Sequence, residues 1–339
     1  MTAASTQQIL VTGDFVLDFH IYQGQRFHYG DQSSQGVVVQ PQMGGAGLVY
    51  DLLQQLQKLH KGDDCEPFHS HSSHTISDII INTPLSPSQH AFAFLRPFSS
   101  GKKDYWRVSE AMGFGANAAD ENQTHEDNVD NQECDGNQQP ETFDVVTISE
   151  GGMGFRQSED WEDLPFDEAR WIVLKSAEPL MSGPLWERLS LKYHDKLILV
   201  VSASDLRKTN ACISKGLSWD TTLRHLFNEL IDGELQALKQ CQHLIVSFGS
   251  EGALWVDLSK PKSVASLIYD PGVVEGDHAI SMQGTVFGLL SCLTASVSAQ
   301  ACNEAPDFEQ ACEAGLAAMK NLLLEGHGPA TELARGFPA

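Results

Sequence analysis

A segment near the C-terminal end, EGDHAISMQGTVFGLLSCLTA (residues 275–295), places an acidic turn and a glycine before a run of small and apolar residues. This pattern predicts a loop that leads into a buried helix. The first amides of a helix lack intrahelical partners and attract anions such as phosphate. We therefore predict an anion site at the backbone of Gly284, in the same loop as the acidic turn that contains Asp277.

Two further carboxylates follow the first predicted strand. The segment QILVTGDFVLDFHIY (residues 8–22) predicts a strand that breaks at Gly13-Asp14, with Asp18 four residues further on. Ionised carboxylates only accept hydrogen bonds, which suits them to hold sugar hydroxyls. Asp14 and Asp18 are therefore candidate substrate-binding residues. The alternative is that Asp14 caps a turn and Asp18 is solvated.

Glycines mark two other candidate segments. Gly44 and Gly45 precede an amphipathic pattern that predicts a helix over residues 43–59. Glycine lets a backbone approach a ligand closely, so both are candidate substrate-binding positions, although plain turn chemistry also explains them. The segment SFGSEGA (residues 247–253) predicts a strand–turn–strand unit that by itself is an ordinary hairpin.

A local basic cluster is unusual in so acidic a chain. Arg96, Lys102, Lys103 and Arg107 fall within LRPFSSGKKDYWRV. Such side chains bind phosphate or carboxylate groups, or they form the basic tips of a hairpin. A group of histidines over residues 60–74 lacks the spacing of a structural zinc site, so we predict a solvated loop and no metal site.

The remaining chain alternates apolar strands with helices. Strands separated by helices in this way predict a mostly parallel sheet that is covered on both faces and binds its ligand at the carboxyl ends of the strands. The predicted strands are 144–149, 169–176, 196–203, 243–250 and 252–257, and the predicted helices are 184–193, 218–231, 285–300 and 308–326. Residues 116–142 are acidic and nearly devoid of large apolar side chains, which predicts a mobile surface insertion.

The bulk composition excludes several classes of function. The formal net charge of −23 over 339 residues disfavours binding to nucleic acid or to anionic membranes. The seven cysteines include no C-x-x-C pair, and the N-terminus lacks the features of a secretory signal. We therefore expect a cytoplasmic protein without a disulfide framework.

In their order along the chain, these segments resemble the ribokinase-like sugar kinases, the PfkB family. ILVTGDFVLD resembles the first strand of that family with its substrate aspartate, GGAG resembles its glycine pair, and LIVSFGSEGALWV resembles its late strand–turn–strand unit. EGDHAISMQGTVFGLLSCLTA falls where the family keeps its phosphate loop. The resemblance covers most of the chain.

The resemblance implies a three-layer α/β/α sandwich with a mostly parallel central sheet and a small β lid. It places a single domain over residues 1–330, with lid strands from 20–42 and 75–115. It also implies phosphate transfer from ATP, with Mg²⁺, to a hydroxyl of a sugar or nucleoside. The implied nucleotide-binding positions are Ser247, Gly249, Gly252 and Thr285. A homodimer formed through the lid is compatible with the resemblance.

The chain departs from the family where chemistry is expected. Aligning Phe287 on the family's phenylalanine puts Met282-Gln283-Gly284-Thr285 in place of Gly-Ala-Gly-Asp, so Thr285 replaces the catalytic aspartate. A threonine hydroxyl with no activating partner is not a base near pH 7. Two interpretations stay open: Asp277 substitutes as the base of an altered kinase, or the chain is a pseudokinase that binds a nucleotide or sugar as a sensor.

Overall fold

The three-dimensional structure is a computed structural model. It describes residues 7–23, 37–61, 76–81, 90–100, 103–112, 143–157, 161–176, 182–207, 209, 219–248, 252–259, 264–268 and 279–325. The predicted insertion at 116–142 lies outside these ranges. None of the helices within them has the length and apolarity needed to cross a membrane.

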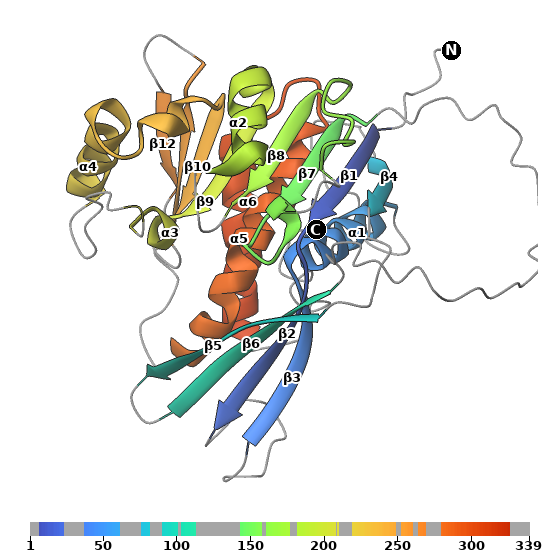
Figure 1. Cartoon of the computed structure of the whole chain (residues 1–339), viewed down its shortest axis with the longest axis vertical. Coiled ribbons are helices and arrows are strands. Elements are labelled where there is room, and N and C mark those ends of the chain that lie inside the picture. Colours follow the sequence, from blue (N-terminus) through green and yellow to red (C-terminus); the bar gives the residue numbers. More distant parts are fainter. Residues whose placement is uncertain are drawn as a thin grey trace, which may run out of the picture.

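Eight of the described strands form one central sheet, in the order β12-β11-β10-β9-β8-β7-β1-β4 (Figure 1). The strands from β10 to β4 pair in parallel, and β11 and β12 are antiparallel additions at one edge. The mostly parallel sheet is therefore confirmed. The strands are β1 (Gln7–Gly13), β4 (Ile76–Ile81), β7 (Val145–Ser149), β8 (Trp171–Lys175), β9 (Leu197–Ser202), β10 (His243–Ser247), β11 (Ala253–Asp257) and β12 (Val264–Ile268).

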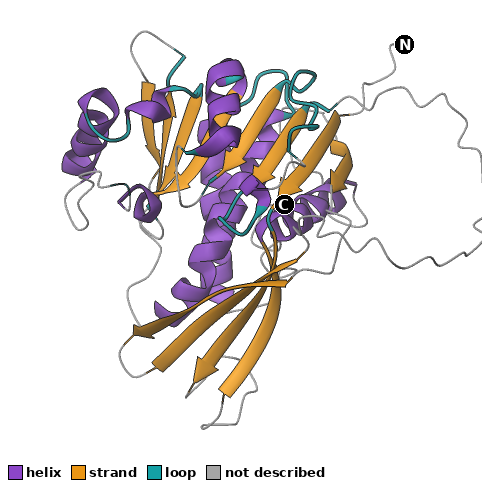
Figure 2. Ribbon diagram, in the orientation of Figure 1, coloured by secondary structure: helices purple, strands orange, loops and turns teal. Residues whose placement is uncertain are grey.

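Helices cover both faces of this sheet (Figure 2). Because side chains alternate along a strand, Val145 packs in one core and Val146 in the other. The first core contains helices α1 (Gly45–Lys61), α5 (Ala279–Ala301) and α6 (Phe308–Glu325). The second contains α2 (Gly183–Lys192), α3 (Ala203–Arg207) and α4 (Trp219–Asp232), with the short 3-10 helices η1 (Phe155–Gln157), η2 (His194–Lys196) and η3 (Gln236–Lys239) on the same chain segments. These are the three predicted layers.

A second, antiparallel sheet projects from the carboxyl ends of the central strands, and we call it the lid (Figure 1). Its strand order is β3-β2-β6-β5, built from β2 (Phe15–Gln23), β3 (Val37–Gly44), β5 (His90–Ser100) and β6 (Lys103–Met112). The lid strands were predicted to lie within residues 75–115. The first strand of that range, β4, instead belongs to the central sheet, because it pairs in parallel with β1. The apolar run at residues 79–81 suits a strand of a covered parallel sheet better than an exposed lid.

Helix α5 runs antiparallel to the central strands and extends past their carboxyl ends. Thr147, in the middle of β7, donates to Ser298 Oγ at 2.8 Å, and Lys175, at the end of β8, donates to Ser291 Oγ at 3.1 Å. The 12 residues from Ser291 back to Ala279 therefore continue for about 18 Å beyond this level. Figure 1 shows these turns extending toward the lid, where α5 contacts β6.

Helices α5 and α6 approach each other closely at Gly315. A Cβ atom at this position would lie 2.9 Å from Leu293 Cδ2 and 3.0 Å from Leu293 Cα. One turn earlier on α6, the carbonyl oxygen of Ala311 accepts a hydrogen bond of 2.7 Å from Ser296 Oγ. The glycine lets α6 hold α5 against the sheet.

We expect Gly315→Val to lower the free energy of unfolding by about 1–3 kcal/mol, because the added side chain meets the backbone of α5. Urea denaturation measures the change. Ala317→Val, at a partly exposed position of the same helix, is the matched control for the helix propensity of valine. Equal effects of the two substitutions would contradict the close approach.

Candidate functional site

The backbone at Asp14 joins the central sheet to the lid. Its N–H donates to Ser149 O of β7 at 2.9 Å, and its carbonyl accepts from Ala46 N in the first turn of α1 at 2.8 Å. The preceding Gly13 has φ +127°, and a Cβ atom there would lie 2.3 Å from Ser149 O. Only glycine fits so close to the neighbouring backbone in that conformation. The predicted break at Gly13-Asp14 is therefore confirmed, and it marks the junction between β1 and β2.

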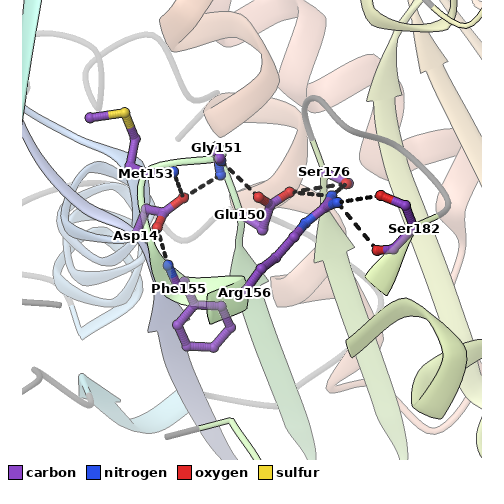
Figure 3. A network of polar contacts seen from close by, with 9 residues as sticks. Asp14, Glu150, Gly151, Met153, Phe155, Arg156, Ser176 and Ser182 are labelled. Carbon is purple, nitrogen blue, oxygen red and sulfur yellow. Dashed lines mark hydrogen bonds and ion pairs between the residues drawn. The ribbon is translucent and has the colours of Figure 1, made fainter. Parts of the chain in front are cut away.

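The carboxylate of Asp14 is fully buried and accepts three backbone hydrogen bonds (Figure 3). Gly151 N and Met153 N donate to Oδ2 at 2.6 and 3.0 Å, and Phe155 N donates to Oδ1 at 2.8 Å. Burial raises the pKa of Asp14, and the three N–H groups and Lys175 act against that rise. The side chain therefore fixes the turn after β7 and keeps spare acceptor capacity on its oxygens.

A buried ion pair lies next to this turn (Figure 3). Arg156 Nη2 is 2.7 Å from Glu150 Oε2, and the two side chains are 9% and 1% exposed. Ser176, directly after β8, completes the pair by accepting from Arg156 at 3.0 Å and donating to Glu150 at 3.2 Å. Burial raises the pKa of Glu150, Arg156 opposes the rise, and the nearby Asp14 carboxylate adds to it.

Lys175 links three elements at the same edge of the sheet. Its ammonium donates to Ser149 Oγ of β7 at 3.2 Å and to Ser291 Oγ of α5 at 3.1 Å. The positive charge faces the carboxyl ends of the central strands, where a parallel sheet binds its ligand. The carboxyl groups that follow β1 and β7 and the ammonium group at the end of β8 thus lie at the same edge of the sheet.

Two of the four predicted nucleotide-binding residues, Ser247 and Gly252, lie farther along this edge. Ser247 is the buried last residue of β10, and Phe248 N donates to Gly252 O at 2.9 Å to close the hairpin with β11. Strands β10 and β1 are four spacings apart in the sheet, or about 19 Å. At β9 between them, Ser202 Oγ donates to Asp205 at 2.5 Å.

The structure brings some of the predicted substrate-binding residues together. Gly44 ends β3 and Gly45 begins α1 with φ +59°, and a Cβ atom on Gly45 would overlap Asp14 O. Asp18 lies on the lid strand β2, where it pairs with Gln42 and Ser109. A substrate contact from any of these residues stays a prediction.

The predicted helix start at residue 285 is wrong, and the anion site at Gly284 stays a prediction that this placement does not favour. Helix α5 begins at Ala279, six residues before its predicted start, so Gly284 is the sixth residue of the helix and Thr285 the seventh. The amides without an intrahelical partner are the first four, which excludes the amide of Gly284. Gly284 also lies about 10 Å along the helix beyond Ser291 and the strand ends. Asp277 and Gly249 lie outside the described residues.

Sequence reasoning overlooked Glu150 and Lys175. Both stand at the carboxyl end of a predicted strand, which was the available signal. Arg156 follows Glu150 by six residues in the same turn, whereas Ser291 comes from a distant segment, so the pairing of Lys175 with Ser291 is a product of the fold.

The described carboxylates at this edge already have hydrogen-bond partners. Asp14, Glu150 and Asp205 accept from backbone amides, Arg156 and serine hydroxyls. The arrangement suits the binding of hydroxyl groups at fixed positions more than proton abstraction by an unengaged base. Within the described ranges, no group of three or more His, Cys, Asp and Glu side chains is arranged to hold a metal ion.

Comparison with solved structures identifies the fold. A ribokinase from Giardia lamblia superposes with a TM-score of 0.50 at 11% identity, over 97% of this chain and 96% of that one. The fold is ribokinase-like. A nucleoside kinase from Methanocaldococcus jannaschii, an archaeal member of the ribokinase family, gives a TM-score of 0.48 at 12% identity, over 98% and 99% of the two chains. No family model and no curated protein sequence matches the chain.

We expect Gly13→Ala to destabilise the protein by at least about 2 kcal/mol, because the methyl group meets the backbone of Ser149 at a positive φ. Thermal and urea unfolding measure the loss. The matched control is Gly151→Ala, whose added Cβ would lie at an ordinary 3.5 Å from Asp14 Oδ2. A tolerated Gly13→Ala would contradict the junction geometry.

The buried ion pair predicts strong coupling in a double-mutant cycle. Glu150→Gln leaves the guanidinium of Arg156 buried without a carboxylate, which costs about 3 kcal/mol or more of stability. Adding Arg156→Gln recovers part of that loss, and urea denaturation of the four proteins gives the coupling energy. Additive losses in the double variant would show that the pair is not formed in solution.

Proposed function

We propose that this ribokinase-like protein binds a sugar or nucleoside, together with a nucleotide, at the carboxyl edge of its central sheet and acts as a sensor with impaired phosphate transfer. One observation supports this most: α5 runs as a helix through Gly284 and Thr285 and carries them past the strand ends. A helix interior offers neither free amides for a transferred phosphate nor, at Thr285, a base.

The geometry at the edge supports retained binding. Asp14 and Gly45 form a close-packed corner at the start of the lid strand that carries Asp18, and about 19 Å of sheet edge separates this corner from Ser247. This separation suits two ligands, or one extended ligand, bound along the edge. The described residues offer no dedicated Mg²⁺ cluster, so Mg²⁺ would be bound mainly through the phosphates of ATP.

An altered kinase is the second candidate, and the position of Asp277 favours it. This residue lies two positions before the first residue of α5 in the sequence. A carboxylate at a helix start is well placed to act close to a bound phosphate. In that case Asp277 would replace the missing aspartate at Thr285 as the base.

Ligand binding and turnover separate the two functions. We expect ATP with Mg²⁺, or a member of a sugar and nucleoside panel, to stabilise the protein, by about 2.7 kcal/mol at 100 times its Kd. We expect no ligand-dependent ADP release, either from the wild type or from Thr285→Asp, because residue 285 lies within the helix. Asp18→Asn should weaken sugar binding about tenfold, whereas Asp104→Asn, at the far end of the lid, should not.

Two results would overturn this proposal. Sugar-dependent ADP release that is lost in Asp277→Asn would establish the altered kinase instead. The absence of a thermal shift with every nucleotide, sugar and nucleoside tested would exclude both functions.

A further inference from the structure

Two buried carboxylates hold the turn after β7 by its backbone amides (Figure 3). Asp14 accepts three of these hydrogen bonds and Glu150 accepts one. The donors are four of the five amides from residue 151 to residue 155, at 2.6–3.0 Å: those of Gly151, Gly152, Met153 and Phe155. The turn is therefore attached to the sheet edge through side-chain acceptors.

The same turn separates Asp14 from solvent. Asp14 is 0% exposed, although it directly follows β1 at the carboxyl edge of the sheet, where a parallel sheet binds its ligand. Gly151 and Gly152, in contrast, are exposed. The carboxylate therefore lies directly beneath a turn whose outer side faces solvent, and no ligand can contact it in this arrangement.

The turn has fixed ends and a glycine-rich middle. Before it, Glu150 N donates to Lys175 O of β8 at 2.8 Å, and after it, Phe155 is buried in the second core. Between these ends, Gly152 and Gly154 have φ values of +77° and +130°. Glycine has no Cβ atom, so it occupies both positive and negative φ without steric conflict. The middle of the turn can therefore move while both ends stay in place.

Such a movement would exchange hydrogen bonds and leave few unmade. It releases Oδ2 of Asp14, whose two donors are the amides of Gly151 and Met153, while Phe155 N keeps Oδ1. Water can bind the freed amides, and water or the hydroxyl groups of a ligand can donate to the freed Oδ2. The backbone of Asp14 bonds separately to Ser149 and Ala46, so the junction with the lid is preserved.

We propose that residues 151–154 form a latch that closes over Asp14, and that this carboxylate meets solvent or a ligand only when the latch opens. The structure shows the closed state, in which the amides of the turn occupy Oδ2 as an autoinhibitory contact. The latch goes beyond the proposed function and does not depend on it. It determines when the edge beside Asp14 is accessible, whichever ligand binds there.

Carboxyl footprinting of the full chain tests the latch without any ligand. A water-soluble carbodiimide couples glycine ethyl ester to accessible carboxyl groups, and tandem mass spectrometry measures the rate at each residue. Asp257 of β11 is the internal control, because it is also buried, at 5% exposed. If the latch opens locally, Asp14 reacts at least about tenfold faster than Asp257, although it is the less exposed of the two in the closed state.

Gly152→Ala should weaken the closed state, because alanine is strained at a φ of +77°. We expect this variant to raise the labelling rate of Asp14 about fivefold and to leave that of Asp257 unchanged. Gly151→Ala is the matched control, since its added Cβ would make only an ordinary contact of 3.5 Å at a φ that is not positive. Urea denaturation establishes that both variants are folded.

Three results would overturn the latch. Equal labelling of Asp14 and Asp257 in the wild type would show that the turn is a fixed part of the core, and this comparison needs no variant. A joint rise of both rates in Gly152→Ala would indicate global unfolding, and equal rates for Asp14 in the two alanine variants would exclude the glycine hinge. None of these results bears on ligand binding, so the latch and the proposed function fail separately.

Discussion

The structure depends most on the hydrogen bonds made by Asp14, a buried residue at the point where the chain leaves the central sheet for the lid. Its backbone ties β1 to β7 and to the start of α1, and its carboxylate holds three amides of the turn after β7. A buried carboxylate is costly unless its oxygens are satisfied. The fold satisfies them with the turn that carries Glu150 and Arg156, so the lid, α1 and the polar edge are positioned together.

The second constraint is the length and direction of α5. Its hydroxyl contacts at Ser291 and Ser298 align it with the strands, and its remaining N-terminal turns reach the lid. Helix α5 continues through Gly284 and Thr285, at the positions where the resemblance to ribokinase-like kinases predicts a phosphate loop. Helix α5 contacts both the central strands and β6 of the lid, and α1 likewise contacts both the central strands and β2 and β3, so the two helices together help to place the lid.

Charge is distributed unevenly over this framework. The acidic groups Asp14 and Glu150 at the sheet edge accept hydrogen bonds from backbone amides and from Arg156 inside the molecule. In the lid, strand pairing and a bulge in β5 place the backbone of Arg107 in register with His20 and with Arg96.

The sequence by itself determined the layers, because continuously apolar strands such as 144–149 and 196–203 alternate with amphipathic helices. The spacing of apolar residues in each element follows from the local backbone geometry of a strand or a helix. It also located the break at Gly13-Asp14 and the hairpin at Ser247–Ala253. Only the tertiary structure decided that β4 joins the central sheet, that α5 begins before Gly284, and that Lys175 meets Ser291. These features depend on contacts between distant segments, and no local pattern of residues specifies such contacts. The alignment of His20, Arg107 and Arg96 has the same cause: the residue types are in the sequence, whereas their register is set by strand pairing and one bulge.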